Sequence, residues 1–267
     1  MPVFQLSHKI GFPPPHLAER EGLLAIGGDL SEERLLLAYR MGIFPWYSED
    51  DPIIWWSPDP RLVLYPEEIR VSRRLARVIR QGGFRVTMDR AFGEVIRECA
   101  RTRRESGEGT WLVDEMVAAY ERLYRSGFAH SVECWQGDRL VGGLYGVSLG
   151  RAFFGESMFM RVSNASKVAF VSLAWQLRKW NFPLVDCQVK TDHLLRFGAR
   201  EVRRRIFLEQ LGRALRFPTR RGRWRFDGQK DADAPVPRRT EFNPENRKRR
   251  KTPARPDKAK LDKKDAS

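Results

Sequence analysis

Three polar residues stand alone inside apolar stretches of the sequence, and their side chains are of the kinds that orient or deprotonate a reacting group. Glu156 lies in the apolar segment 153–159, while Asp186 and Gln188 lie in the apolar segment 184–189. A carboxylate is costly to bury unless it is hydrogen-bonded or paired. Because side chains alternate along a strand, Asp186 and Gln188 should share one face. The pattern predicts the floor of a site, although an edge strand with a solvated polar face would show the same pattern.

Two tryptophans lie in segments that are typical of loops. Trp46 stands between Pro45 and Tyr47, and Trp111 follows a polar stretch that contains glycines. A tryptophan ordinarily belongs to the core, but an indole on a loop can stack on a nucleic-acid base or close an apolar pocket. Both residues are therefore candidates for a binding site as well as for the core.

The segment 72–81 predicts a helix with a basic side. Arg73, Arg74, Arg77 and Arg80 have the spacing of neighbours on a helix surface. A solvated face explains such a row, and a face that follows phosphate groups explains it as well in so basic a chain. The segment Asn164-Ala-Ser-Lys opens another helix, where free backbone N–H groups favour an anion or a carbonyl oxygen, or a simple N-cap.

The charge of the chain narrows its partners without naming one. The 267 residues carry a formal net charge of +15. Residues 228–267 hold 13 basic and 7 acidic side chains, a net of +6, so a net of +9 remains on the rest of the chain. A basic surface attracts polyanions, which include nucleic acids and anionic membrane faces.

Several functional classes lack their signatures. The sequence has no run of about 18 apolar residues, so no membrane span is predicted, and its N-terminus lacks the apolar core of a signal peptide. The three cysteines are scattered, which argues against a disulfide framework and favours a reduced, cytoplasmic setting. The four histidines have no metal-ligand spacing, so we assign no metal. Neither a nucleophile elbow nor a phosphate-binding glycine loop is present.

The pattern of apolar residues and turn residues predicts mixed helices and strands. Helices are expected at 30–41, 72–81, 91–100, 114–126, 166–180 and 192–197, and strands at 84–88, 129–135, 140–149, 151–160 and 184–189, with a last element at 202–207. This order predicts an α/β or α+β sandwich for residues 71–217. A small N-terminal α/β domain in 1–70 precedes it, and a disordered basic tail in 228–267 follows it.

Nine segments that follow one another between about residue 4 and residue 210 resemble the leucyl/phenylalanyl-tRNA–protein transferase family. They are Gly22-Leu-Leu-Ala-Ile-Gly-Gly-Asp-Leu-Ser, Gly42-Ile-Phe-Pro-Trp-Tyr, Trp55-Trp-Ser-Pro-Asp-Pro-Arg, Gly109-Thr-Trp, His130-Ser-Val-Glu, Val141-Gly-Gly-Leu-Tyr-Gly-Val, Gly155-Glu-Ser-Met-Phe, Asn164-Ala-Ser-Lys and Asp186-Cys-Gln-Val. Nine motifs in order are very specific, unlike any one of them alone.

The resemblance implies a fold and a reaction. The C-terminal domain would have a GNAT-type N-acyltransferase fold. The protein would transfer Leu or Phe, and Met less well, from aminoacyl-tRNA to proteins that begin with Arg or Lys, which tags them for N-end rule degradation. It would need no metal and no cofactor, because the aminoacyl ester is already activated. A monomer without membrane attachment is the default expectation.

The resemblance also implies roles for residues at matching positions. The aminoacyl side chain would enter an apolar pocket, and the 3′-terminal adenosine would stack near Trp46 and Trp111, with the arginines of segment 72–81 on the acceptor stem. The pocket residues would be Leu144, Phe153, Met158 and Val185. The family often has Met at position 144, so the pocket shape differs slightly here.

Three polar residues would then handle the reacting groups. Asp186 would orient or deprotonate the attacking amine, and Gln188 would hold the amine or the carbonyl. Glu156 would hold the aminoacyl amine or pair with the cationic acceptor side chain. A purely positional, substrate-assisted mechanism is equally compatible with the residues.

Two other interpretations remain at this stage. An acetyl-CoA-dependent N-acetyltransferase would share the fold, but its pyrophosphate loop needs glycines, and the turn Arg161-Val-Ser-Asn-Ala-Ser-Lys has none. A noncatalytic RNA-binding protein would explain the aromatic and basic residues. It would leave Asp186, Gln188 and the apolar pocket without a role.

Overall fold

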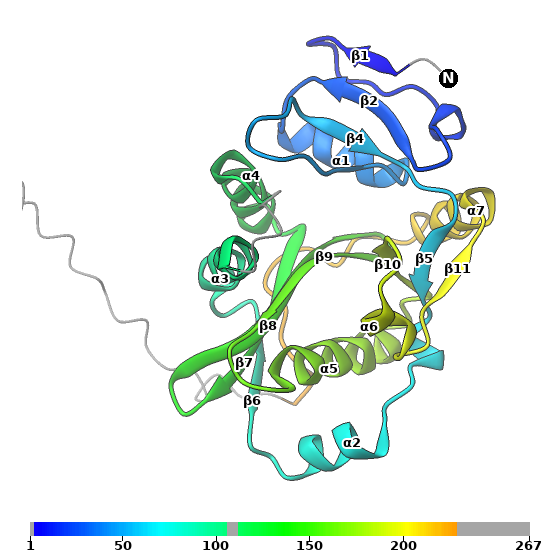
Figure 1. Cartoon of the computed structure of the whole chain (residues 1–267). Helices are drawn as coiled ribbons and strands as arrows, with labels where there is room; N and C mark the ends of the chain where they lie inside the picture. The colour runs from blue at the N-terminus through cyan, green and yellow to red at the C-terminus, as the bar shows by residue number, and fades with distance from the viewer. Residues whose placement is uncertain (1–2, 106–111, 229–267) are drawn as a thin grey trace, which may run out of the picture. The chain divides into compact units, whose positions relative to one another are not determined.

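A small sheet forms the N-terminal part of the computed structural model, which describes residues 3–105 and 112–228 (Figure 1). Its strand order is β1-β2-β4-β3, with bounds Phe4–Leu6, Leu23–Gly27, Ile54–Trp56 and Phe44–Pro45. Helix α1 (Glu32–Arg40) packs with this sheet and begins at Ser31, whose hydroxyl accepts a hydrogen bond from the backbone N–H of Arg34. Such an N-cap satisfies a backbone donor that the helix itself leaves unpaired. A 3-10 turn (Pro15–Leu17) lies between β1 and β2.

A seven-stranded mixed sheet forms the larger part of the molecule. Its strand order is β11-β5-β10-β9-β8-β7-β6. The strands are β5 (Arg61–Leu64), β6 (Arg85–Met88), β7 (Ala129–Gln136), β8 (Arg139–Leu149), β9 (Ala152–Met160), β10 (Leu184–Gln188) and β11 (Arg200–Val202). β9 and β10 run parallel, and the other neighbours are antiparallel. Two sheets with helices confirm the mixed α/β prediction, while the GNAT-type assignment stays a prediction.

Helices cover both faces of the seven-stranded sheet (Figure 1). On one face, α3 (Phe92–Glu105) and α4 (Asp114–Arg125) share a buried core with α1 and the small sheet. On the other face, α5 (Ala165–Lys179) packs with α2 (Arg73–Arg80) in a second core. The short helix α6 (Asp192–Leu195) and the 3-10 turn Pro66–Glu68 complete this side. Among residues 3–105 and 112–228, no helix is both long and apolar enough to cross a bilayer.

The segment expected as one element at 202–207 contains a boundary instead. β11 ends at Val202, and α7 (Arg204–Ala214) begins two residues later and runs well beyond 207. The carboxylate of Asp59 accepts the backbone N–H of Arg204 at 2.9 Å, so a residue far away in the sequence caps this helix. Phe207 and Leu211 are buried at helical spacing, which anchors α7 on the core.

The structure crosses the domain limits predicted near residues 70 and 217. The larger sheet includes β5 at residues 61–64, on the N-terminal side of the boundary expected near residue 70, and all described residues belong to one compact unit. The division into domains 1–70 and 71–217 remains a prediction. The chain continues past 217 as ordered backbone, and Trp224 is buried against the ring of His130 at a centroid distance of 3.7 Å. The tail predicted for 228–267 lies outside the described residues beyond Gly228.

Candidate active site

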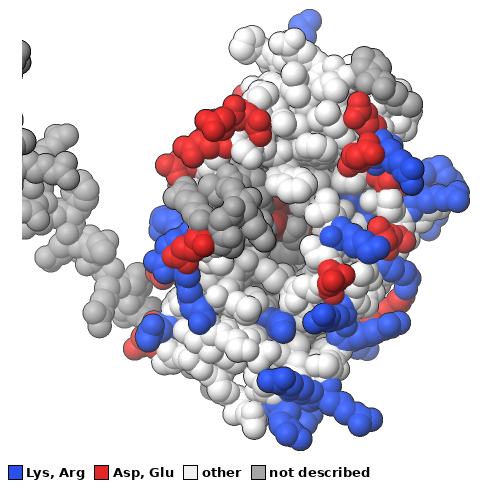
Figure 2. All heavy atoms as spheres, in the orientation of Figure 1, with Lys and Arg blue, Asp and Glu red and all other residues white. Residues whose placement is uncertain are grey.

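A cavity of about 450 Å³ lies between β8, β9, β10, α5, α6 and the short strand β3. Figure 2 shows the corresponding hollow in the molecular surface. Most of its wall is apolar and comes from Leu144, Phe153, Met158, Phe170, Leu173 and Val185. All four residues predicted for an apolar pocket therefore lie in one cavity, and α5 adds two more that the sequence did not single out.

The polar end of the cavity is formed by Glu156 and Gln188, and two β-bulges place them there. On β9, Gly155 and Ser157 face successive residues of β8, so Glu156 is the extra residue between them. On β10, the register shifts between Asp186 and Gln188. A bulge adds a residue to one strand and re-aims the side chains beside it.

The bulge in β10 overturns the predicted alternation of this strand. Gln188 has a backbone φ of 61° and lines the cavity together with Cys187, while Asp186 lies outside the cavity. The expectation that Asp186 and Gln188 share a face is therefore wrong. The cause is local, because Oδ1 of Asp186 accepts the backbone N–H of Gln188 at 2.9 Å and holds the irregular turn.

Glu156 is at the centre of a buried hydrogen-bond network. Its Oε1 accepts the hydroxyl of Tyr39 on α1 at 2.8 Å and the side-chain amide of Gln188 at 2.9 Å. Its Oε2 accepts the hydroxyl of Tyr120 on α4 at 2.8 Å. Burial raises the pKa of the Glu156 carboxyl to about 7, and the hydrogen bonds from the two tyrosines oppose that rise. A carboxyl with this pKa exists in both protonation states near neutral pH.

Asp186 forms a buried ion pair behind the cavity wall. Nε and Nη2 of Arg61 donate to its two oxygens at 2.8 and 2.7 Å, and both side chains are almost fully buried. The guanidinium of Arg61 also lies between the rings of Phe44 and Phe207, 4.6 and 4.8 Å from their centroids. Removing one partner of such a pair costs roughly 3–5 kcal/mol, because the other charge stays buried.

Sequence reasoning missed three residues of this network. Tyr39 and Tyr120 gave no signal, because a tyrosine on an apolar helix face is typical of a core. Arg61 did give one, since it is the only charged residue in the buried strand Arg61–Leu64. The argument that selected Asp186, a lone charge in an apolar strand, would have selected Arg61 as its partner.

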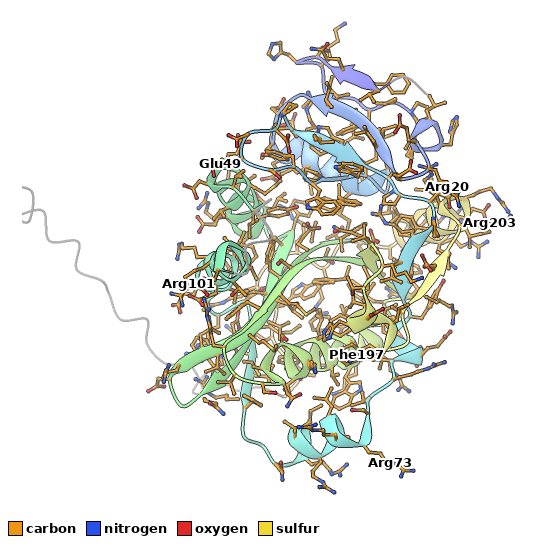
Figure 3. The ribbon with its side chains drawn as sticks, viewed as in Figure 1. Arg20, Glu49, Arg73, Arg101, Phe197 and Arg203 are labelled. Atoms are coloured by element: carbon orange, nitrogen blue, oxygen red, sulfur yellow. The ribbon has the colours of Figure 1, made fainter. Side chains whose placement is uncertain are left out.

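One aromatic candidate, Trp46, and the four basic candidates lie at the surface. Trp46 lines the cavity and is 41% exposed, with its ring tilted against that of Trp56. Trp111 lies outside the described residues. The arginines 73, 74, 77 and 80 are all exposed on α2, and Figure 3 shows Arg73 pointing away from the molecule. Within the described part of the chain, no cluster of three or more His, Cys, Asp or Glu side chains could hold a metal ion.

This geometry fits an amino acid or a derivative of one. The apolar wall can bury an apolar side chain, which contributes roughly 1.5–3 kcal/mol for a group the size of Leu or Phe. Glu156 and Gln188 then offer a carboxylate and an amide oxygen to an amine at the polar end.

Comparisons with known proteins agree with this description. The family model "Leucyl/phenylalanyl-tRNA protein transferase" matches residues 63–212, and the model of the N-terminal domain of the same family matches residues 28–59. A leucyl/phenylalanyl-tRNA–protein transferase of Anaeromyxobacter sp. (strain Fw109-5) is 62% identical over 227 residues, which cover 85% of this chain and 97% of that protein. One from Syntrophobacter fumaroxidans is 62% identical over 79% of this chain and 90% of that protein.

Solved structures are much more distant. The structure of L-PGS from Bacillus licheniformis aligns with 79% of this chain and 70% of its own, at 10% identity and a TM-score of 0.35, which is too low to support an inference. The two family models, in contrast, cover every strand that lines the cavity. The chain belongs to the leucyl/phenylalanyl-tRNA–protein transferase family and is a transferase.

Proposed function

We propose that this protein transfers leucine or phenylalanine, and methionine less well, from aminoacyl-tRNA to the α-amine of proteins that begin with Arg or Lys. The product would then be degraded through the N-end rule pathway. The observation that carries the proposal is one cavity with an apolar wall and, at its polar end, a buried carboxylate and an amide. We further propose a GNAT-type fold for the larger domain, a cytoplasmic monomer and a reaction without a cofactor.

The apolar wall is the proposed site for the donor side chain. Leu144, Phe153, Met158 and Val185 line the cavity, and we expect this wall to suit side chains without a branch at Cβ. Isoleucine and valine would fit less well, but one misplaced methyl group costs only about 1–3 kcal/mol, so some transfer of them is expected. Trp46 at the rim is the proposed stacking partner of the terminal adenosine.

The bond changes of the reaction are those of ester aminolysis. The acceptor amine attacks the carbonyl carbon of the aminoacyl ester, a C–N bond forms, and the bond from that carbon to the ribose oxygen breaks. The proton lost by the amine ends on the ribose oxygen, and tRNA leaves with a free hydroxyl. Because the side-chain N–H of Gln188 donates to Glu156, its carbonyl oxygen is left to accept a hydrogen bond from the amine.

Asp186 is better described as a positioning residue than as a base. It is fully buried, pairs with Arg61 and accepts the backbone N–H of Gln188. Asp186→Asn should lower kcat by loosening Gln188, with little change in KM. In a Gln188→Ala background the same substitution should have almost no further effect, because the residue it positions is gone. Equal losses in both backgrounds would show that Asp186 acts independently.

The arginine row on α2 is the proposed contact with the acceptor stem. Its side chains are exposed, and no ion pair joins them to any other described residue. Phosphate contacts position a nucleic acid without reading its sequence. We therefore expect weak selectivity for the body of the tRNA and a marked dependence of binding on salt concentration.

The deciding experiment is a transfer assay with purified protein, leucyl-tRNA and two peptides that differ only in their first residue, Arg or Ala. A mass increase of one leucine residue on the Arg peptide alone would support the reaction and its acceptor rule together. Valyl-tRNA serves as the matched donor control and should react more slowly. If tRNA binds but neither peptide gains mass, the protein is an RNA-binding protein and the proposed reaction is wrong.

A further inference from the structure

The wall of the cavity contains a histidine that the proposed reaction does not use. His193 on α6 lines the cavity, and its ring packs edge-on against Phe197 at a centroid distance of 5.2 Å. Its Nε2 atom is buried, and no other described residue gives it a hydrogen-bond partner. A buried polar atom without a partner is costly, so a ligand that supplies the missing hydrogen bond gains affinity.

Two cations are placed on the elements around this histidine. Arg196 follows His193 by three residues at the end of α6, and Lys167 lies one turn before Phe170 on α5, whose ring is 5.1 Å from that of Phe197. Both cations lower the pKa of His193, after the larger effect of burial. Lys167 is half-buried and Arg196 is exposed. Neither of them forms an ion pair with another residue of the described chain. Two unpaired cations and a neutral ring N–H together form a typical environment for an oxyanion.

The surface charge indicates where an anion would leave the cavity. In Figure 2, Lys and Arg side chains lie below the hollow and on both sides of it, and Asp and Glu side chains lie above it on both sides and to its right. Basic side chains continue to the lower edge of the molecule, where Figure 3 labels Arg73 of α2. A polyanion that leaves the cavity toward the lower edge therefore meets mainly basic side chains, and Glu156 is the one acidic residue among the described residues of the cavity wall.

We infer that Lys167, His193 and Arg196 bind the phosphodiester group of the 3′-terminal nucleotide of the donor, an inference that rests on the proposed function. The ammonium of Lys167 and the guanidinium of Arg196 pair with the phosphate oxygens, and Nε2–H of His193 donates to one of them. Lys167 contributes more than Arg196, because its charge is less screened by solvent.

A series of donors tests this assignment. Leucyl-tRNA and a leucyl ester of the trinucleotide CpCpA both carry the phosphodiester, whereas leucyl-adenosine does not. Lys167→Met, which keeps an unbranched apolar stem, and His193→Gln should each raise KM about tenfold for the first two donors. With leucyl-adenosine, KM should rise by less than about twofold. A rise of equal size with all three donors would overturn the inference and assign the residues to the aminoacyl group or to folding.

Three controls make the result specific. Lys167→Arg should restore most of the affinity, and Arg213→Met on α7 changes the net charge by the same amount at a remote exposed position. Arg73→Met and Arg77→Met should weaken the binding of leucyl-tRNA but not that of leucyl-CpCpA. This difference would separate the contribution of α2 from that of the three residues near the cavity. If Lys167→Met unfolds in a thermal melt, the exposed residue Arg196 provides the test through Arg196→Gln.

The outcomes also separate this inference from the proposed function. If the wild-type protein uses all three donors and no variant distinguishes among them, the transfer reaction stands and the phosphate site is wrong. If the wild-type protein uses none of them, both are wrong. Binding of uncharged CpCpA, compared with adenosine, gives a readout without turnover. CpCpA should bind more weakly to Lys167→Met than to the wild type, whereas adenosine should bind equally to both. Equal binding of CpCpA to the variant and the wild type would count against the site.

Discussion

Glu133 on β7 and Glu156 on β9 are both buried, and burial raises the pKa of each carboxyl to about 7. Their surroundings differ. Oε1 of Glu133 accepts the backbone N–H groups of Arg90 and Ala91 at 3.1 and 3.3 Å, at the start of α3. The hydroxyls of Ser131 and Thr87 donate to it as well. Among the residues that the structure describes, only side chains donate to Glu156, and Glu156 borders the cavity.

The difference separates a carboxylate that supports the fold from one that can meet a substrate. Glu133 accepts hydrogen bonds from neighbouring residues of its own sheet and from the backbone at the start of α3, and it does not line the cavity. Glu156 depends on α1, α4 and β10, three elements that only the tertiary structure brings together. A raised pKa therefore reports burial, and the adjoining cavity is what marks a functional site.

The largest expected effect is on catalysis. Glu156→Ala should lower kcat/KM for leucyl-tRNA and an Arg peptide by about 10²–10³, because an amine at the polar end loses its carboxylate. Glu133→Gln should leave kcat/KM per folded molecule essentially unchanged. Steady-state transfer rates on both proteins, at a temperature where both are folded, measure the contrast. Normal activity in Glu156→Ala would reverse the comparison.

The next effect is on stability. Glu133→Ala should lower the free energy of unfolding by about 3 kcal/mol, since it strands two backbone donors at the start of α3 and two buried hydroxyls. Glu121→Ala on α4 is the matched control, because its carboxylate pairs with exposed Arg97 and should matter by less than about 1 kcal/mol. Urea unfolding measures both values. A loss as small as that of the control would mean that the Glu133 network is replaced by water.

The pH dependence of stability sharpens the same contrast. A carboxyl with a pKa near 7 in the fold and 4.5 as its ordinary value binds its proton more tightly when folded. The contribution of such a group to the free energy of unfolding is fully present below about pH 4.5. It falls by about 2–3 kcal/mol as the pH rises toward 7. Glu133→Gln should flatten this fall in urea melts between pH 5 and pH 7.5. An unchanged slope would show that Glu133 is already ionised in the fold at pH 5.

The sequence predicts the regular helices and strands well, because the patterns that indicate them are local. The apolar patterns of α4, α5 and the strands β7 to β10 predicted elements whose observed bounds differ by only a few residues. The apolar wall around Phe153 was likewise accessible through the family resemblance. α7 was missed, since its first residue is capped by Asp59, which is far away in the sequence.

The sequence identified residues of the polar end of the cavity, but it did not predict how their side chains are arranged. An extra residue in a strand leaves no trace in an apolar pattern, so neither the bulge at Glu156 nor the one before Gln188 was expected. That is why Asp186 was placed in the site, whereas it lies behind the wall in an ion pair with Arg61. The partners Tyr39 and Tyr120 reach Glu156 from 117 and 36 residues away, a separation that no periodicity reveals.

The smallest expected effect concerns Tyr39 and Tyr120, the two tyrosines that donate hydrogen bonds to Glu156. Their hydroxyls stabilise the ionised carboxylate and so lower its pKa, with Tyr120 the larger cause. Tyr120→Phe should therefore raise the pKa of Glu156 further and move the acid limb of the kcat/KM profile to higher pH, with Tyr39→Phe moving it less. At the pH optimum, the loss of activity should stay below about tenfold, the value of one hydrogen bond.

Tyr124→Phe is the control on the same helix, because its hydroxyl donates to the backbone carbonyl of Asp89 and has no contact with Glu156 in the described network. If all three variants have the same acid limb of the kcat/KM profile as the wild type, the titrating group is the acceptor amine or another residue. Glu156 is then ionised throughout the pH range of the profile. If only Tyr120→Phe and Tyr39→Phe shift it, the protonation of Glu156 controls the reaction. In that case the two hydroxyls keep a buried carboxylate usable near neutral pH, a requirement that Glu133, which binds only structural donors, does not have.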